Sequence, residues 1–120
     1  MITRVKFIGI PVRDQQAQLE FYTGKLGFQV LTDQPMGPQR WIELKIPRAE
    51  TSVVLFTPPG HEERVGGFVN ASLSCDDVQG TYEELAARGV EFVRPPTQEP
   101  WGTYAMFKDA DGNQLVLSGR

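Results

Sequence analysis

The sequence predicts an α+β fold built from two tandem βαβββ units. Hydrophobic residues recur with a period of two in some segments and of about 3.6 in others, as half-buried strands and amphipathic helices require. The order strand, helix, three strands occurs twice along the chain, with equivalent positions 62 or 63 residues apart. Two sheets that are each covered by a helix on one face can face each other, so we expect them to form a cup-shaped mixed sheet.

Composition limits the size of the fold and the classes of partner. The 120 residues, 40% hydrophobic and 22% charged, suffice for one domain, with one unit at about 1–60 and the other at about 66–120. A net charge of −3 gives no electrostatic reason to expect nucleic acid or a membrane as partner. No apolar run approaches the roughly 18 residues of a spanning helix, and the N-terminus shows no signal-peptide pattern. With a single cysteine, Cys75, no intrachain disulfide can form, and we expect a cytoplasmic protein.

The first unit opens with a strand over residues 4–12. Asp14 is a suitable N-cap for a helix that runs to about Gly24, and Gly27 breaks the helical pattern. The remaining elements of this unit are strands beginning at 28–30 and spanning 39–46 and 52–57, and then a linker at 58–60.

The second unit repeats this order. A strand over 68–75 leads to the cap Asp77, a helix over 78–88 and the stop Gly89. Asp77 lies 63 residues after Asp14, and Gly89 lies 62 after Gly27. Chance similarity between two α+β stretches is the alternative, but the order of elements agrees as well as the residues. The remaining strands are expected at 90–93, 102–108 and 113–118, the last two joined by a turn in which Asp109 and Asp111 are interpreted as turn formers.

Strand alternation assigns the two faces of each sheet. The more aliphatic alternation should pack on the helices: Ile8, Ile10, Val12, Ile42, Leu44, Ile46, Val54, Phe56, Ala71, Leu73, Cys75, Ala105, Phe107, Leu115 and Leu117. The opposite alternation mixes aromatic, aliphatic and polar groups, as a ligand cavity does: Phe7, Gly9, Trp41, Glu43, Lys45, Val53, Leu55, Asn70, Ser72, Tyr104, Met106, Gln114 and Val116.

These features resemble the vicinal oxygen chelate superfamily, which includes glyoxalases, bleomycin-resistance proteins and extradiol dioxygenases. The resemblance covers nearly the whole chain and depends on the order and spacing of its motifs. The matching motifs are Ile10-Pro-Val-Arg-Asp14, Phe21-Tyr22, Leu26-Gly27-Phe28, Cys75-Asp-Asp77, Glu84-Leu85, Arg88-Gly89-Val90-Glu91-Phe92 and the stretch from Pro100-Trp101-Gly102 to Asn113.

The resemblance also implies where a metal would be held. Metal-dependent members place one ligand on the first strand and one on the last strand of each unit, which correspond here to Phe7, Leu55, Asn70 and Val116. Aliphatic and aromatic side chains cannot coordinate a divalent ion, and a neutral amide alone holds one poorly. We therefore expect no metal and no other cofactor, and the metal-free proteins that sequester drugs become the nearer comparison.

We expect a small, partly aromatic molecule to be the ligand. Trp41 and Tyr104 could stack on it, or could be ordinary sheet aromatics or dimer contacts, and Trp101 should lie at the rim. Glu43 is a candidate general base, or could instead pair with Lys45 or Arg40. The expected ligand-binding residues are Phe7, Trp41, Leu55, Asn70, Trp101, Tyr104, Met106 and Val116.

Three functions stay open. The leading one is a homodimeric, metal-free binder of a small molecule. The second is a glyoxalase- or dioxygenase-like enzyme, a lyase, isomerase or oxidoreductase that uses Glu43 or a metal held by other residues. The third is a dimerisation module without a ligand. His61, the only histidine, lies in a charged loop and is expected to be an ordinary surface residue.

Overall fold

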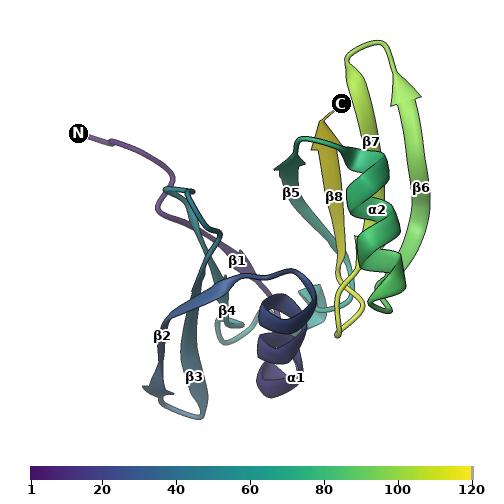
Figure 1. Ribbon diagram of the computed structural model, residues 1–120. Coiled ribbons are helices and arrows are strands. Elements are labelled where there is room, and N and C mark those ends of the chain that lie inside the picture. Colours follow the sequence, from purple (N-terminus) through teal and green to yellow (C-terminus); the bar gives the residue numbers. More distant parts are fainter. Residues whose placement is uncertain (120) are drawn as a thin grey trace. The chain divides into compact units, whose positions relative to one another are not determined.

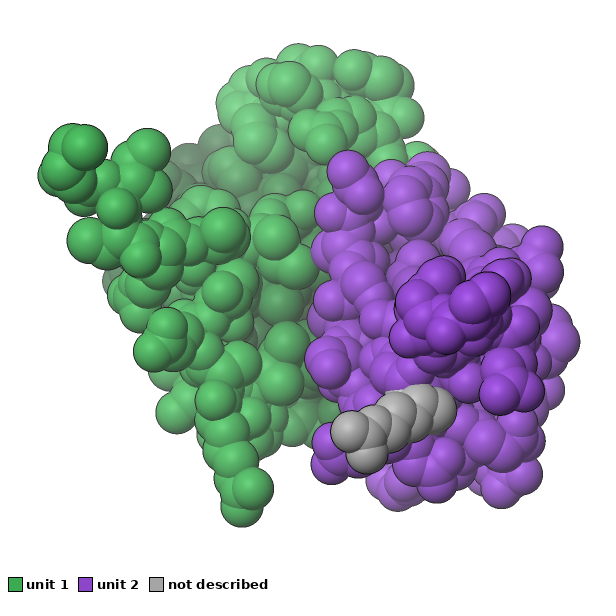
Figure 2. Space-filling view, turned by 90° about the horizontal axis from the view of Figure 1, so that it is seen from above, with its two compact units in different colours: residues 1–65 green, residues 66–120 purple. Residues whose placement is uncertain are grey.

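The computed structural model describes residues 1–119 and divides into two compact units, Met1–Val65 and Gly66–Arg120 (Figure 2). Each unit contains one four-stranded mixed sheet and one main helix (Figure 1). The α+β class and the repeated βαβββ order are therefore confirmed. No helix in the described part of the chain has the length and apolar character needed to cross a membrane.

The first unit has the strand order β1-β4-β3-β2, in which β1 runs parallel to β4 and the other pairs are antiparallel. The helix α1 begins after Asp14, whose carboxylate accepts a hydrogen bond from the backbone N–H of Ala17 (3.0 Å). It continues as a wider π-helical turn, and Gly27 follows with φ of 80°, a conformation that favours glycine. The elements are β1 (Phe7–Ile10), α1 (Gln15–Glu20), η1 (Phe21–Lys25), β2 (Gln29–Met36), β3 (Gln39–Lys45), β4 (Ser52–Leu55) and η2 (Glu62–Arg64).

The second unit repeats this topology with the order β5-β8-β7-β6. Asp77 caps α2 by accepting from the backbone N–H of Gly80 (3.0 Å), as Asp14 caps α1. Its strands at 68–75 and 102–108 have the expected bounds. The elements are β5 (Phe68–Cys75), α2 (Val78–Ala87), β6 (Glu91–Glu99), β7 (Gly102–Lys108) and β8 (Gln114–Gly119).

The turn before β8 is held by one buried carboxylate. Asp109 accepts hydrogen bonds from the backbone N–H groups of Asp111 and Asn113 (both 3.0 Å) and from the Asn113 side-chain amide (2.9 Å). The side-chain oxygen of Asn113 (Oδ1) in turn accepts from the backbone N–H of Gly66 (2.7 Å). The interpretation of Asp109 and Asp111 as turn formers is therefore confirmed.

The core of each unit lies between its sheet and its helix. In the first unit Ile10, Ile42 and Leu44 are at most 1% exposed, and in the second Phe107 and Leu115 are fully buried. The helix α1 contacts β4, while α2 contacts β6, β7 and β8. For these residues the expected helix-facing side of the sheet is correct.

The strand β4 faces the opposite way from the expectation. Leu55 pairs with Ile42 and Val53 pairs with Leu44, so Val53 and Leu55 lie on the helix-facing side and are almost fully buried. Val54 therefore points to the open face. All four residues of β4 are buried, so the strand lacks the polar–apolar contrast from which its faces could be assigned.

Replacing Phe107 with alanine should lower the free energy of unfolding by about 3–5 kcal/mol, because the cavity left in a close-packed core cannot collapse completely. Phe107 is fully buried and packs against Phe92, with ring centroids 6.0 Å apart. Val93→Ala, at an exposed position of the same sheet, is the control and should change stability by about 0.5 kcal/mol or less. Urea unfolding measures both. Equal losses for the two variants would contradict the assigned core.

Candidate functional site

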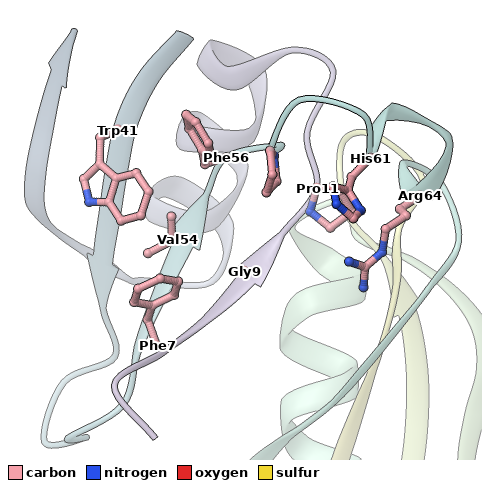
Figure 3. A pocket seen from close by; sticks show the side chains of 9 residues that line it. Phe7, Gly9, Pro11, Trp41, Val54, Phe56, His61 and Arg64 are labelled. Carbon is pink, nitrogen blue, oxygen red and sulfur yellow. The ribbon is translucent and has the colours of Figure 1, made fainter. Parts of the chain in front are cut away.

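A pocket of about 330 Å³ opens on the face of the first sheet that α1 does not cover. This volume is at the small end of the range of about 300–1,000 Å³ that is usual for ligand sites. The lining residues come from β1 and the residue after it, from β3 and β4, and from the segment that follows β4 (Figure 3): Phe7, Gly9, Pro11, Trp41, Val54, Phe56, Pro58, His61 and Arg64.

One end of the pocket has aromatic walls. The rings of Phe7 and Trp41 meet edge to face, with centroids 5.6 Å apart and planes at 82°. Trp41 also packs against Phe56 at 5.3 Å, and Val54 lies among these three rings (Figure 3). Phe7 and Trp41 face a cavity as expected, whereas Phe56 and Val54, which were expected to face the helix, line the pocket instead.

Gly9 leaves open space in the wall formed by β1. It pairs with Val54 across the parallel ladder, and a Cβ atom added to it would meet nothing within 4 Å. Its φ lies outside the left-handed region, so a larger residue could adopt its backbone conformation. The missing side chain at position 9 therefore enlarges the pocket without being required by the backbone.

Glu43 positions the indole of Trp41. One carboxylate oxygen accepts a hydrogen bond from the Ser52 hydroxyl (2.6 Å), and the other accepts a longer one from Trp41 Nε1 (3.4 Å). Glu43 is not among the residues that line the pocket. Both oxygens therefore have donors within the protein, which favours a positioning role over that of a general base.

The alternative of a salt bridge from Glu43 to Arg40 or Lys45 is wrong. Arg40 instead pairs with Asp33 on β2, with 2.6 Å between guanidinium nitrogen and carboxylate oxygen. Hydrogen bonding from Arg40 holds the pKa of Asp33 below its usual value. Lys45 is exposed, and Glu43 forms no ion pair within the described residues 1–119.

The other end of the pocket is polar and comes from a single turn. His61 and Arg64 line it, and the backbone N–H of Arg64 donates to the carbonyl oxygen of His61 (3.1 Å). In a 3₁₀ turn, residues three apart lie on the same side. Glu62 instead lines a separate depression, and hydrogen bonds from the backbone N–H groups of Glu62 and Gly60 lower its pKa. His61 was expected to be an ordinary surface residue. It is exposed, but it also borders this pocket.

Thr57 joins the strands that carry the pocket residues. Its hydroxyl accepts from the backbone N–H of Val12 (2.7 Å) and donates to the Val12 carbonyl (2.9 Å). The side-chain amide of Gln39 donates to the Thr57 carbonyl (2.6 Å) and accepts from the Thr57 N–H (3.1 Å). These four hydrogen bonds fix the end of β1 and the start of β3 to the segment after β4.

The chain matches the family model of the Glyoxalase/Bleomycin resistance protein/Dioxygenase superfamily over residues 4–117. The chain belongs to this superfamily. The resemblance inferred from the motifs is thereby confirmed, and the two units described above are the repeated halves over which the match extends.

Several known proteins are similar to this chain in sequence or structure. YetH of Bacillus subtilis (strain 168) is 39% identical, with 98% of each chain covered. The crystal structure of a superfamily member from Sphaerobacter thermophilus DSM 20745 has a TM-score of 0.89 at 36% identity, covering 99% of this chain and 98% of that one. TnmS3, an antibiotic binding protein from Streptomyces sp. CB03234, has a TM-score of 0.87 at 35% identity, covering 98% and 96%.

The positions expected to correspond to the superfamily's metal ligands carry mainly apolar side chains. Because Val54, not Leu55, faces away from the helix, Val54 is the residue equivalent to Val116, and this leaves Phe7, Val54, Asn70 and Val116 at those positions. Only Asn70 has a side chain that can coordinate a cation. Within residues 1–119, no three histidine, cysteine, aspartate or glutamate side chains group in a way that could hold a metal ion.

The remaining expected ligand residues lie on the second unit. Val116 pairs with Ser72 on one side and with Met106 on the other, so these residues share the face that α2 does not cover. Asn70 is exposed and lies in the irregular part of β5, between Phe68 and Ser72. Trp101, 66% exposed, stacks on Tyr104 with centroids 5.8 Å apart. That these residues and the pocket of the first unit bind one ligand together stays a prediction.

Replacing Thr57 with valine should lower the free energy of unfolding by about 1–3 kcal/mol, because the buried N–H and carbonyl of Val12 would lose their partner. Thr51→Val is the matched control. Its hydroxyl makes one exposed hydrogen bond, to the Val5 carbonyl, so its loss should cost less. Urea unfolding compares the two variants, and equal costs would show that the Thr57 hydroxyl is dispensable.

The purified protein should contain no stoichiometric divalent metal, because the superfamily's ligand positions carry mainly apolar side chains here. Elemental analysis after dialysis measures this. One tightly held zinc, nickel, manganese or iron ion per chain would contradict the expectation, as would an activity that a chelator removes and added metal restores.

Proposed function

We propose that this protein is a cytoplasmic homodimer that binds a small, partly aromatic molecule without using a metal. The observation that carries the proposal is the pocket of the first unit, in which Phe7, Trp41 and Phe56 surround an open space left by Gly9. An apolar cavity with few polar groups at one end is the usual form of a small-molecule site.

The relatives support binding as the function. TnmS3, which is 35% identical over nearly its whole length, is described as an antibiotic binding protein. The aromatic walls of the present pocket suit a flat ligand, because aromatic pairs contribute about 0.5–1.5 kcal/mol beyond the burial of their surface. The name of this relative does not specify the ligand of the present chain, so we propose only the chemical class.

The enzyme alternative has less support. Glu43, the candidate base, already accepts hydrogen bonds from Ser52 and Trp41 and does not line the pocket. If the protein is instead a dimerisation module, the pocket aromatics should contact the second subunit and not a ligand. Oligomeric state, measured on the same variants as binding, distinguishes this module from the proposed function.

Anthracene carboxamide is a suitable uncharged probe, because it is planar and its fluorescence reports binding. Trp41→Ala should weaken its binding about tenfold, which corresponds to about 1.4 kcal/mol of lost stacking and burial. Gly9→Val should weaken binding at least as much by filling the pocket, while leaving stability unchanged or raised, since valine favours strands.

Gly24→Ala is the control for the substitution at position 9, because an added Cβ also meets nothing within 4 Å there and Gly24 lies in η1, away from the pocket. It should leave binding unchanged. Wild-type protein that fails to bind the probe, or Gly9→Val protein that binds it as well as wild type, would refute the proposed site. Variants that fold but become monomeric would favour the dimerisation module.

A further inference from the structure

We propose that the ligand carries an anionic group, such as a carboxylate or an ionised phenol, and that this group lies against Arg64 and His61. The inference rests on the proposed binding function and extends it from a planar molecule to a planar acid. It depends on three features of the pocket: the placement of its basic residues, the absence of an acidic residue from its lining, and the change in charge from one end of the pocket to the other.

The two basic residues belong to one turn and point the same way. His61 and Arg64 are three residues apart across η2, and both line the pocket (Figure 3). A 3₁₀ turn places residues with this spacing on one side, so the turn itself separates them from the intervening Glu62 and Glu63. The remaining seven lining residues are uncharged, and none of the nine is acidic.

Arg64 is available to a ligand. Within the described residues 1–119, its guanidinium forms no ion pair, although two glutamates precede it. Glu62, the first residue of the turn, accepts a hydrogen bond from the backbone N–H of Gly60 (3.2 Å) and lines a different depression. A planar guanidinium can bind both oxygens of a carboxylate, and apolar walls strengthen such a pair relative to open water.

Charge changes along the pocket and so orients the ligand. Phe7 pairs with Ser52, and the Ser52 hydroxyl binds the Glu43 carboxylate, so this end of the sheet carries a negative charge beside Trp41. Arg64 lies beyond the opposite end of β4. An acid bound with its rings against Trp41 and its anionic group toward Arg64 gains attraction at one end and avoids repulsion at the other.

The test compares anthracene carboxylate with anthracene carboxamide, which have the same rings and differ in charge. Wild-type protein should bind the carboxylate about tenfold more tightly, as expected for a charge-assisted hydrogen bond in a partly exposed site. Arg64→Gln should remove this preference by weakening carboxylate binding to the level of carboxamide binding. Arg64→Lys should keep part of it, because charge is retained and the planar fork is lost.

Arg13→Gln is the matched control, since Arg13 lines the separate depression with Glu62 and not this pocket. It should leave the preference intact. Equal binding of the two probes by wild type, or a preference that survives Arg64→Gln, would overturn the anionic assignment while leaving the proposed function in place. Failure of wild type to bind either probe would instead refute the proposed function itself.

Discussion

The hydroxyl and backbone of Thr57 form hydrogen bonds to two segments that are distant in sequence, and the geometry of the pocket depends on this junction. Val12 is tied to the hydroxyl and Gln39 to the backbone, so the end of β1 and the start of β3 are held against the residues that leave β4. The neighbours of Thr57 in sequence, Phe56 and Pro58, both line the pocket, as does Pro11 beside Val12. The same junction sets where the chain enters the turn that carries His61 and Arg64. It therefore contributes, together with the pairing of β4 with β1 and β3, to the separation between the aromatic and basic ends of the pocket.

Most of the fold could be predicted because its signals are local. Asp14 and Asp77 cap their helices as expected, and Gly27 and Gly89 follow those helices with positive φ. The assignment of faces was less secure in β4, where burial on both sides removes the alternation that identifies a face. The spacing between the two repeated units does identify which residue of β4 faces away from the helix. Val54 lies 62 residues before Val116, which agrees with the spacing of the other equivalent positions, whereas Leu55 lies 61 before it.

The candidate site was harder to predict than the fold, because it combines strand residues with a turn that has no periodic signal. Phe7 and Trp41 could be placed from alternation alone, since the isoleucine and leucine residues of their strands gather on the opposite face. His61 and Arg64 could not, because their approach to the pocket depends on the 3₁₀ turn after the proline-rich segment and not on any residue pattern. For Glu43, the face of the sheet could be predicted but the contacts could not. Its position on the open face was predicted, but its partners, Ser52 and Trp41, follow only from three-dimensional contacts.

The volume of the pocket depends on a single residue, Gly9. Glycine within a strand costs about 0.5–1 kcal/mol of stability relative to alanine, so the protein gives up stability to keep this space empty. Because the backbone there can adopt the conformation of other residues and an added Cβ atom meets nothing within 4 Å, alanine would reduce the volume and valine or leucine would reduce it further. Related proteins could therefore diverge in the size of molecule that they accept through single substitutions at this position, each of which would also strengthen the strand. Selection for a larger ligand would keep glycine at position 9 although other residues stabilise the strand more. Without that selection, larger residues at position 9 would fill the pocket.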